Sequence, residues 1–392
     1  MTNRLTFPDP TEEDLRELTA FRRDLHRNPE LPGEEQETAR RVCEMLASTR
    51  PDHVLTGLGG HGVAAIFDSG APGPTIMFRA ELDALPIQEL GEIAHRSTVP
   101  GKAHLCGHDG HMTILLGFAR ILSRKPPSSG RVVLMFQPAE EDGSGAAAVI
   151  ADPRYDRIRP DWAFALHNMP GIEFGTGKIS IGVANCASRG VWIRLTGSTA
   201  HASRPSDGRS PMQAMCEIMP ALENLGSGQP LGPDFTMVTL THATMGAESY
   251  GVAPGEALIM ATLRTVADDQ MDALVEQAET LIRDVARRHD LQYELGYDDV
   301  FLACTNAPEA VAHLTAGLER AGMTPRIENL PSVASEDFGR FGLGGAHSAM
   351  VFLGAGLDRP GVHTPEYDFR DEMIPMGIRL YSETLAECLS ES

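Results

Sequence analysis

The amino-acid sequence predicts a two-domain α/β protein in which a mixed, mostly parallel sheet is flanked by helices. Strand-like and helical segments alternate through the first half of the chain, as they do in parallel sheets with crossover helices. A complete β-α-β-β-α-β set follows, which is typical of a ferredoxin-like α+β unit. The C-terminal remainder has too few elements to fold alone, so we expect it to complete the first domain. The predicted boundaries are 1–186 with 303–392 for that domain, and 187–302 for an inserted second domain.

The first domain opens with two predicted helices. Apolar residues recur at helical spacing from Glu12 to Leu25, two prolines and a glycine then break the pattern, and a second helix is expected from about Glu34 to Ser48. Glycine and proline turns separate four predicted strands, GVAAIFD, TIMFRAELDAL, RVVLMFQPAEE and WAFALHNM. A helix, HMTILLGFARILSR, lies between the second and third of these. Residues that bind ligands gather at the carboxyl ends of such strands.

The inserted domain and the tail follow in the same way. The insertion is predicted to contain, in order, GVWIRLTGS, the helix SPMQAMCEIMPALENL, FTMVTLTHATMG, EALIMATLRTV, the helix DDQMDALVEQAETLIRDVARRH and LQYELGYDDV. The tail offers the helix APEAVAHLTAGLERAG, a turn-rich SVASEDFGRFGLGG, the strand SAMVFLGAG and the closing helix MIPMGIRLYSETLAECLS.

Charge, apolar runs and cysteine content indicate which partners and which classes of protein are not expected. The formal net charge is −21, from 54 acidic and 33 basic residues, so nucleic acids and anionic membranes are not expected as partners. The N-terminal residues carry no apolar secretion signal, and the longest apolar runs are far shorter than a membrane span. Six scattered cysteines do not form the dense pattern of a small secreted scaffold, so we expect them to be reduced in a cytoplasmic protein.

One short stretch, HLCGHDGH, concentrates side chains that bind metals. Cys106 and His108 flank a glycine, so on an extended or loop backbone both side chains point to the same side. Glu140 and Glu141 end a predicted strand, where adjacent residues face opposite ways and can take different tasks. His167 ends another strand. Five residues are thus candidate ligands: Cys106, His108, Glu141, His167 and His363.

Each of these residues also has a structural interpretation when taken alone. Cys106 could be a small buried hydrophobic residue, and His167 a hydrogen-bonded residue at a strand end. The glutamate pair could be a solvated turn, and His363 could cap a loop. The metal interpretation is favoured because all of them fall at strand ends or adjoining loops of one layer.

Five motifs together carry a family resemblance: LCGHDGHMTILLGFA, FQPAEEDGSGA, ALHNMPG, GSTAHASRPSDGRSP and HTPEYDF. In this order they resemble the M20 metallopeptidases, and within them the branch of bacterial hippurate hydrolases and plant auxin-conjugate amidohydrolases. The resemblance covers nearly the whole chain. It implies a metal-dependent amidohydrolase that cleaves N-acyl amino acids, and an inserted domain that acts as a lid and dimerises.

The resemblance also implies roles for individual residues. Two divalent ions per subunit would be bridged by the Cys106 thiolate and bound by the other four candidate ligands. Glu140 resembles the family's general base, and Asp83 the aspartate that orients a ligand. His201 resembles a lid histidine that donates to the carbonyl under attack, often from the partner subunit. His104, Asp109 and His111 are expected to be structural.

The substrate-binding residues are less clearly marked. Arg264 resembles a family arginine that is available to a substrate carboxylate, although an exposed strand arginine is an equally good interpretation. Where relatives read Asn-Val-Ile-Pro, this chain has Gly251 in place of the asparagine, which removes an amide donor and acceptor. Tyr250, next to it, is a candidate to compensate.

The donor types suit zinc, cobalt or nickel better than magnesium or calcium, and the family also admits manganese. Other functions stay open at this point. The chain could be a dipeptidase or carboxypeptidase of the same family, a thiol hydrolase with Cys106 as nucleophile, or a metal-dependent binder of small ligands without catalysis. Glu140 argues against a pure binder, which needs no base beside a ligand.

Overall fold

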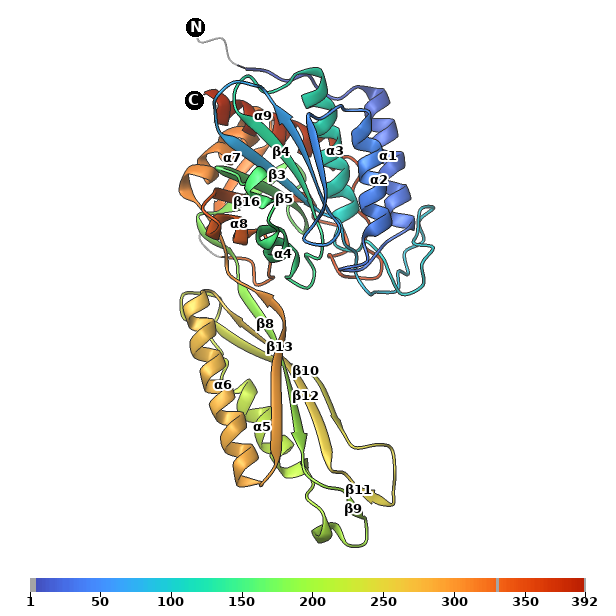
Figure 1. Ribbon diagram of the computed structural model, residues 1–392, viewed down its shortest axis with the longest axis vertical. Helices are drawn as coiled ribbons and strands as arrows, with labels where there is room; N and C mark the ends of the chain where they lie inside the picture. Colours follow the sequence, from blue (N-terminus) through green and yellow to red (C-terminus); the bar gives the residue numbers. More distant parts are fainter. Residues whose placement is uncertain (1–4, 329–330, 391–392) are drawn as a thin grey trace. The chain divides into compact units, whose positions relative to one another are not determined.

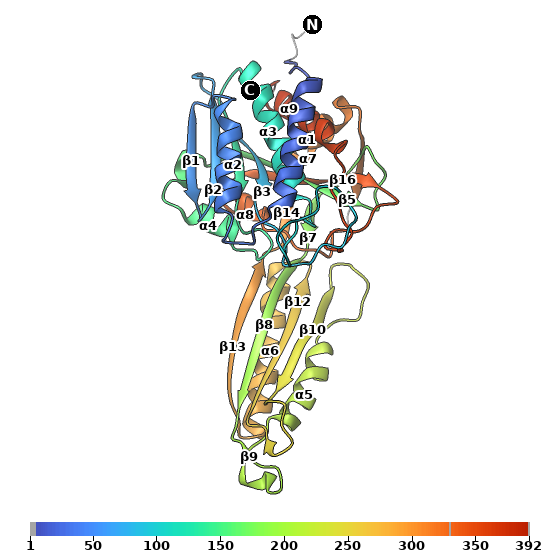
Figure 2. The same ribbon diagram turned by 90° about the vertical axis from the view of Figure 1, so that its right-hand side faces the viewer.

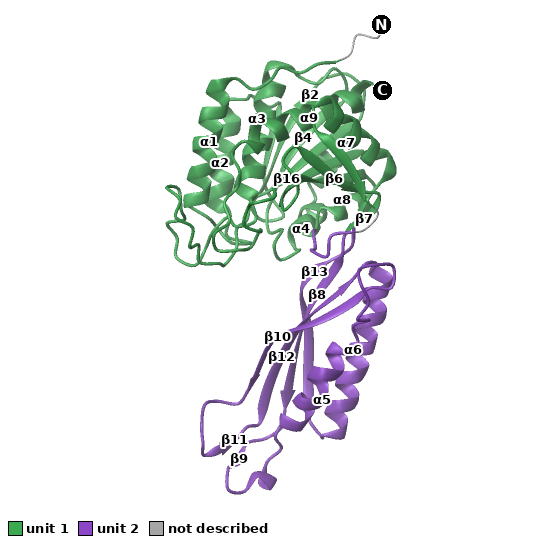
Figure 3. Ribbon diagram, turned by 180° about the vertical axis from the view of Figure 1, so that it is seen from behind, with its two compact units in different colours: residues 1–184, 305–329, 337–392 green, residues 185–304, 330–336 purple. Residues whose placement is uncertain are grey.

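The computed structural model describes residues 5–328 and 331–390, which form two compact units (Figure 3). Unit 1 comprises Met1–Ala184, Thr305–Asn329 and Asp337–Ser392, and unit 2 comprises Asn185–Cys304 and Leu330–Glu336. The sequence placed the short segment 330–336 in the first domain, whereas it belongs to unit 2. The roles of the two units in catalysis and dimerisation remain predictions.

Unit 1 is built on an eight-stranded mixed sheet (Figure 1). Along the sheet, the strands are β1 (His53–Leu58), β2 (Gly62–Asp68), β4 (Arg131–Gln137), β3 (Thr75–Glu81), β5 (Trp162–Pro170), β16 (His347–Gly356), β6 (Thr176–Ser180) and β15 (Thr324–Glu328). The central strands pair in parallel, β4 with β3, β3 with β5 and β5 with β16. Because their carboxyl ends meet at one edge, the segments that follow them are brought together there.

Helices cover both faces of this sheet (Figure 2). One group packs together against it: α1 (Glu12–Arg27), α2 (Gln36–Ala47), α3 (His108–Arg124), α7 (Pro308–Arg320) and α9 (Met373–Ser390). The short α4 (Gly145–Ala151) and α8 (Gly339–Leu343) contact each other and the strands β4 and β16. α3 is buried along nearly its whole length, which fits its apolar sequence. The predicted fold class is confirmed.

Unit 2 has the predicted ferredoxin-like order of elements. Its antiparallel sheet runs β10 (Thr236–Met245), β12 (Glu256–Thr265), β8 (Ala187–Thr196) and β13 (Gln292–Phe301). α5 (Met212–Glu223) and α6 (Asp268–Arg288) pack together and against these strands. A small ladder joins β9 (Ala200–His201) to β11 (Val252–Ala253). Two further short strands, β7 (Gly182–Asn185) and β14 (Cys304–Asn306), pair with each other, and most of their residues belong to unit 1.

Two local predictions were wrong. We expected His108 on an extended or loop backbone, but α3 begins at His108, and Gly107 before it adopts a left-handed conformation with φ of 101°. We expected Glu140 and Glu141 within a strand, but β4 ends at Gln137 and both lie in the following turn. Sequence patterns also missed β1, β6 and β15, which are short and lie toward or at the ends of the sheet.

Candidate dinuclear metal centre

All five predicted metal ligands lie together in unit 1. Cys106 immediately precedes the glycine that turns the chain into α3, so the thiol and the His108 imidazole leave one rigid turn. Glu141 lies in the turn after β4, and His167 lies near the end of β5. His363 lies in a loop and has a φ of 65°, a strained value for a residue other than glycine.

The ligand atoms form two groups that share one atom. Cys106 Sγ lies within 4.8 Å of ligand atoms of His108 and His167, and likewise forms a group with Glu141 and His363. Its distances to the two imidazoles are 3.4 Å to His167 Nε2 and 3.3 Å to His363 Nε2. A sulfur and a nitrogen that share a tetrahedral zinc ion lie about 3.6 Å apart. The thiol therefore has the position of a bridge between two metal ions.

Asp83 contacts one residue of each ligand group. Its backbone oxygen lies 2.9 Å from His108 Nδ1, and its carboxylate accepts a hydrogen bond of 2.8 Å from the Glu141 backbone amide. This leaves His108 Nε2, which is buried and makes no hydrogen bond with the described residues, 3.8 Å from Glu141 Oε1. An unbonded ring nitrogen that faces a carboxylate at this distance fits a metal ligand.

Burial shifts the pKa values of these groups. Burial, together with the charges of Glu141 and Glu140, raises the pKa of the Cys106 thiol well above its usual value. Burial, with the nearby His111, lowers the pKa of His167 to about 3, so this imidazole is neutral. A thiol nucleophile needs a lowered pKa, whereas the pKa of the Cys106 thiol is raised. The thiol-hydrolase alternative is therefore disfavoured.

Glu140 forms a group of possible ligand atoms with His108 and Glu141, but it is not in either group that contains Cys106. It is buried, and its carboxylate lies 3.9 Å from His108 Nε2, while Glu141 faces the same nitrogen. The carboxylates of these two adjacent residues thus have different positions relative to the thiol, although both residues lie in a turn and not in a strand. This arrangement fits one metal ligand and one group that handles protons.

The comparisons with known proteins agree with this geometry. The family model described as peptidase family M20/M25/M40 matches residues 77–387. The chain belongs to this peptidase family. Its membership and the paired ligand groups make it a metal-dependent M20 amidohydrolase with a centre for two divalent ions.

Several M20 relatives match this chain over most of their length. The chain is 28% identical to a hippurate hydrolase from Campylobacter jejuni, with 94% of this chain and 95% of the relative covered. It is 30% identical to an N-acetyl-L-cysteine deacetylase from Bacillus subtilis, with 89% and 82% covered. Among solved structures, a dinuclear metal-binding M20 peptidase from Bacillus subtilis matches with a TM-score of 0.78 at 25% identity, covering 97% and 99%.

The other predicted site residues lie in unit 2. His201 is in β9, where its Nδ1 lies 2.8 Å from Ser203 Oγ. Arg264, in β12, donates hydrogen bonds to the Val333 carbonyl and to Ser335 Oγ. Arg264 thus contacts the segment 333–335, which the sequence did not suggest.

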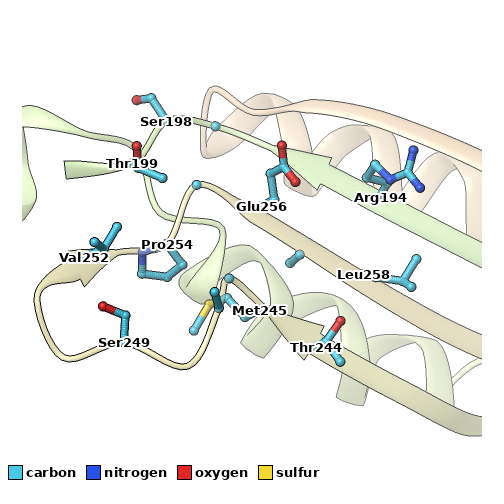
Figure 4. A pocket seen from close by; sticks show the side chains of 15 residues that line it. Arg194, Ser198, Thr199, Thr244, Met245, Ser249, Val252, Pro254, Glu256 and Leu258 are labelled. Atoms are coloured by element: carbon cyan, nitrogen blue, oxygen red, sulfur yellow. The ribbon is translucent and has the colours of Figure 1, made fainter.

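A cavity of about 940 Å³ lies within unit 2, at the ends of β8, β10 and β12 (Figure 4). Ser249 and Val252 line it, on either side of Tyr250 and Gly251 in the chain. Tyr250 is fully exposed, and a Cβ added at Gly251 would meet no atom within 4 Å. The two predicted substrate-binding positions therefore belong to an exposed segment beside this cavity.

Sequence reasoning assigned His111 a packing role and did not mention Glu81, Asn168 or Tyr367. In the structure, hydrogen bonds connect these four buried residues close to the candidate metal ligands. A signal was present in the sequence, since three of them lie one to four residues from a candidate ligand.

Proposed function

We propose that this chain hydrolyses the amide bond of small N-acyl amino acids, with Glu140 as general base. The observation that carries the proposal is the Cys106 thiol shared by two ligand groups, with the Glu140 carboxylate next to them. The printed names of relatives support the substrate class, because hippurate, N-acetyl-L-cysteine and IAA-amino acids are all N-acyl amino acids.

The residues would hold two ions in a defined way. Cys106 with His108 and His167 would hold one ion, and Cys106 with Glu141 and His363 would hold the other. The ions when bound lower the pKa of a water molecule and polarise the substrate carbonyl. One thiolate, three imidazoles and one carboxylate suit zinc, cobalt, nickel or manganese.

Glu140 carries the proton through the reaction. Its carboxylate takes a proton from the attacking water as the new carbon–oxygen bond forms at the amide carbon. The same carboxyl group then gives that proton to the nitrogen as the carbon–nitrogen bond breaks. The products are a carboxylate and an amine. His201 is proposed to donate a hydrogen bond to the oxyanion, as an oxyanion hole does.

The lid is also proposed to complete the enzyme as a dimer. β10 forms an edge of the unit 2 sheet, pairs only with β12 among the described strands, and is largely exposed over its second half. An exposed edge strand can pair with a second copy across a two-fold axis. The acidic composition and the six free cysteines support a cytoplasmic location.

The proposal is tested by removing and restoring the metal. Chelator-treated protein is reloaded with zinc, manganese, cobalt or nickel in turn, and amine release is followed from N-acetyl, N-benzoyl and indole-acetyl amino acids and from dipeptides. We expect activity to vanish with the metal and to return on acyl amino acids. Activity that survives metal removal would contradict the mechanism, and cleavage of dipeptides alone would favour a dipeptidase.

A further inference from the structure

A chain of buried hydrogen bonds runs beneath the metal centre in unit 1. His111 Nδ1 lies 2.6 Å from Glu81 Oε2, and His111 Nε2 lies 2.7 Å from Asn168 Oδ1. The Asn168 side-chain amide donates to the Tyr367 hydroxyl at 2.7 Å. All four side chains are at most 2% exposed. We call Glu81, His111, Asn168 and Tyr367 the relay.

Three of the four members of the relay are close in sequence to a candidate metal ligand. Asn168 directly follows His167, and His111 lies one helical turn after His108. Tyr367 lies four residues after His363. The relay therefore joins the three segments that supply the imidazoles, and the Asn168 backbone amide adds a hydrogen bond of 3.2 Å to His111 Nε2. A backbone hydrogen bond also links two of these segments, since the His363 amide donates to the Leu105 carbonyl.

Packing leaves the relay little freedom to move. A Cβ at Gly107 would lie 2.0 Å from Asn168 Oδ1 and 2.8 Å from the Tyr367 hydroxyl, so the backbone of the Cys106 turn rests directly on the relay. A shift of the Asn168 amide would therefore be transmitted to Cys106 and His108. Close-packed interiors transmit such displacements because few voids absorb them.

The opposite end of the relay is fixed by charge. Arg79 forms an ion pair with Glu81 and another, at 2.8 Å, with Asp337. Burial raises the pKa of Glu81, but the charges of Arg79 and His111 outweigh it and hold that pKa well below its usual value. Glu81 is thus an ionised anchor for His111.

We propose that Asn168 and Tyr367 are positioning residues that hold the His167 and His363 segments at the spacing needed for two metal ions. This inference rests on the proposed function, since it concerns the ligands assigned there. Without the Tyr367 hydroxyl, the Asn168 amide loses its acceptor in a buried site, and the loop that carries His363 loses its link to β5.

The test replaces the hydroxyl alone, in the full-length protein. Tyr367→Phe is compared with the unmodified chain for zinc affinity, measured by competition with a metal-binding dye, and for the absorption spectrum of the cobalt-loaded protein. We expect zinc affinity to fall by about 10- to 100-fold, which is the usual effect of losing a group that orients ligands. The thiolate-to-cobalt absorption should also shift, because the ligand geometry around Cys106 changes.

Tyr381→Phe is the matched control. Tyr381 is equally buried in unit 1. Its hydroxyl accepts from the Leu166 amide in β5 at 3.0 Å and donates to the Arg79 carbonyl at 3.3 Å, so these hydrogen bonds go to backbone groups outside the relay. Its loss should lower thermal stability while leaving zinc affinity and the cobalt spectrum unchanged. Equal effects of the two substitutions on both metal readouts, or none from Tyr367→Phe, would overturn the inference. Failure of the unmodified chain to bind zinc or cobalt would instead overturn the proposed function.

Discussion

At the scale of single residues, Glu140 separates catalysis from metal binding. Glu140→Gln keeps the size of the side chain but removes the carboxylate that accepts the proton. We expect amide hydrolysis to fall by about 10²- to 10⁴-fold, the usual contribution of a general base, while both metal ions stay bound. Steady-state rates and metal content measured on the same preparation check this outcome.

The neighbouring carboxylate offers a control for that substitution. Asp142 lies two residues away, and its carboxylate accepts a hydrogen bond from the Ser144 amide. Asp142→Asn should therefore leave the rate within a few-fold. Full activity in Glu140→Gln would mean that Glu140 is not the base. Metal loss in place of rate loss would mean that Glu140 is a ligand.

Gly251 is a second residue with a measurable consequence. A side chain fits at this position, because its Cβ would meet nothing within 4 Å and its φ lies outside the left-handed region. If the family asparagine contacts the substrate here, Gly251→Asn adds one hydrogen bond, about 0.5–1.5 kcal/mol. We expect KM for N-benzoyl amino acids to fall by about 2- to 10-fold.

Gly251→Ala is the control, because it restricts the backbone without adding an amide. It should not lower KM. If alanine and asparagine lower KM equally, loss of backbone freedom and not a new contact explains the effect, and the position does not recognise substrate.

At the scale of elements, strands and helices with a strong apolar pattern were predicted correctly from the sequence. The strand Gly62–Asp68 and the helix Asp268–Arg288 follow from continuous apolar residues and from helical spacing. The five candidate ligands were chosen from their motifs and the family resemblance, and the structure brings them close together. The backbone around the ligands was not, because Gly107 starts α3 three residues earlier than the apolar pattern does. A left-handed glycine leaves no periodic signal.

The relay is a clearer example of a feature that the sequence did not predict. Asn168 and Tyr367 lie 199 positions apart, and nothing near either residue in the sequence indicates the other. Their contact depends on β5 and the His363 loop meeting at one edge of the sheet, which is a property of topology. Ligand residues are recognisable by type. Nearness to a candidate ligand marks a residue such as Asn168 or Tyr367, but its long-range contacts are seen only in the fold.

At the scale of the whole molecule, the insertion was predictable because the tail could not fold alone. The short strands β6 and β15 were missed because each has only five residues, and they pair with each other in parallel although they lie far apart in the sequence. The segment 330–336 was assigned to the wrong unit for a similar reason. Its place depends on contacts such as that of Arg264 with Ser335, which no local pattern encodes.

Unit 1 is also held together by a buried charge network that joins its first helix to distant segments. His26, in α1, lies 2.9 Å from Asp109 in α3 and 3.3 Å from Glu89. The nearby Arg22 pairs with Asp109 at 3.2 Å, and the His95 ring packs against His26. Burial and Arg22 lower the pKa of His26, but the bonds to Asp109 and Glu89 raise it overall, to about 9 from 6.5.

This shift predicts how the stability of unit 1 depends on pH. Because the folded state holds the proton more tightly, the contribution of His26 is fully present below pH 6.5 and is lost as pH rises through about 9. The loss amounts to about 3 kcal/mol, at 1.36 kcal/mol per unit of pKa. Thermal unfolding with chelator present, at pH 6 to 9.5, should show the melting temperature of the unmodified chain falling toward that of His26→Gln. A constant difference between the two proteins across this range would mean that His26 is neutral in the fold and that Asp109 is compensated by Arg22 alone.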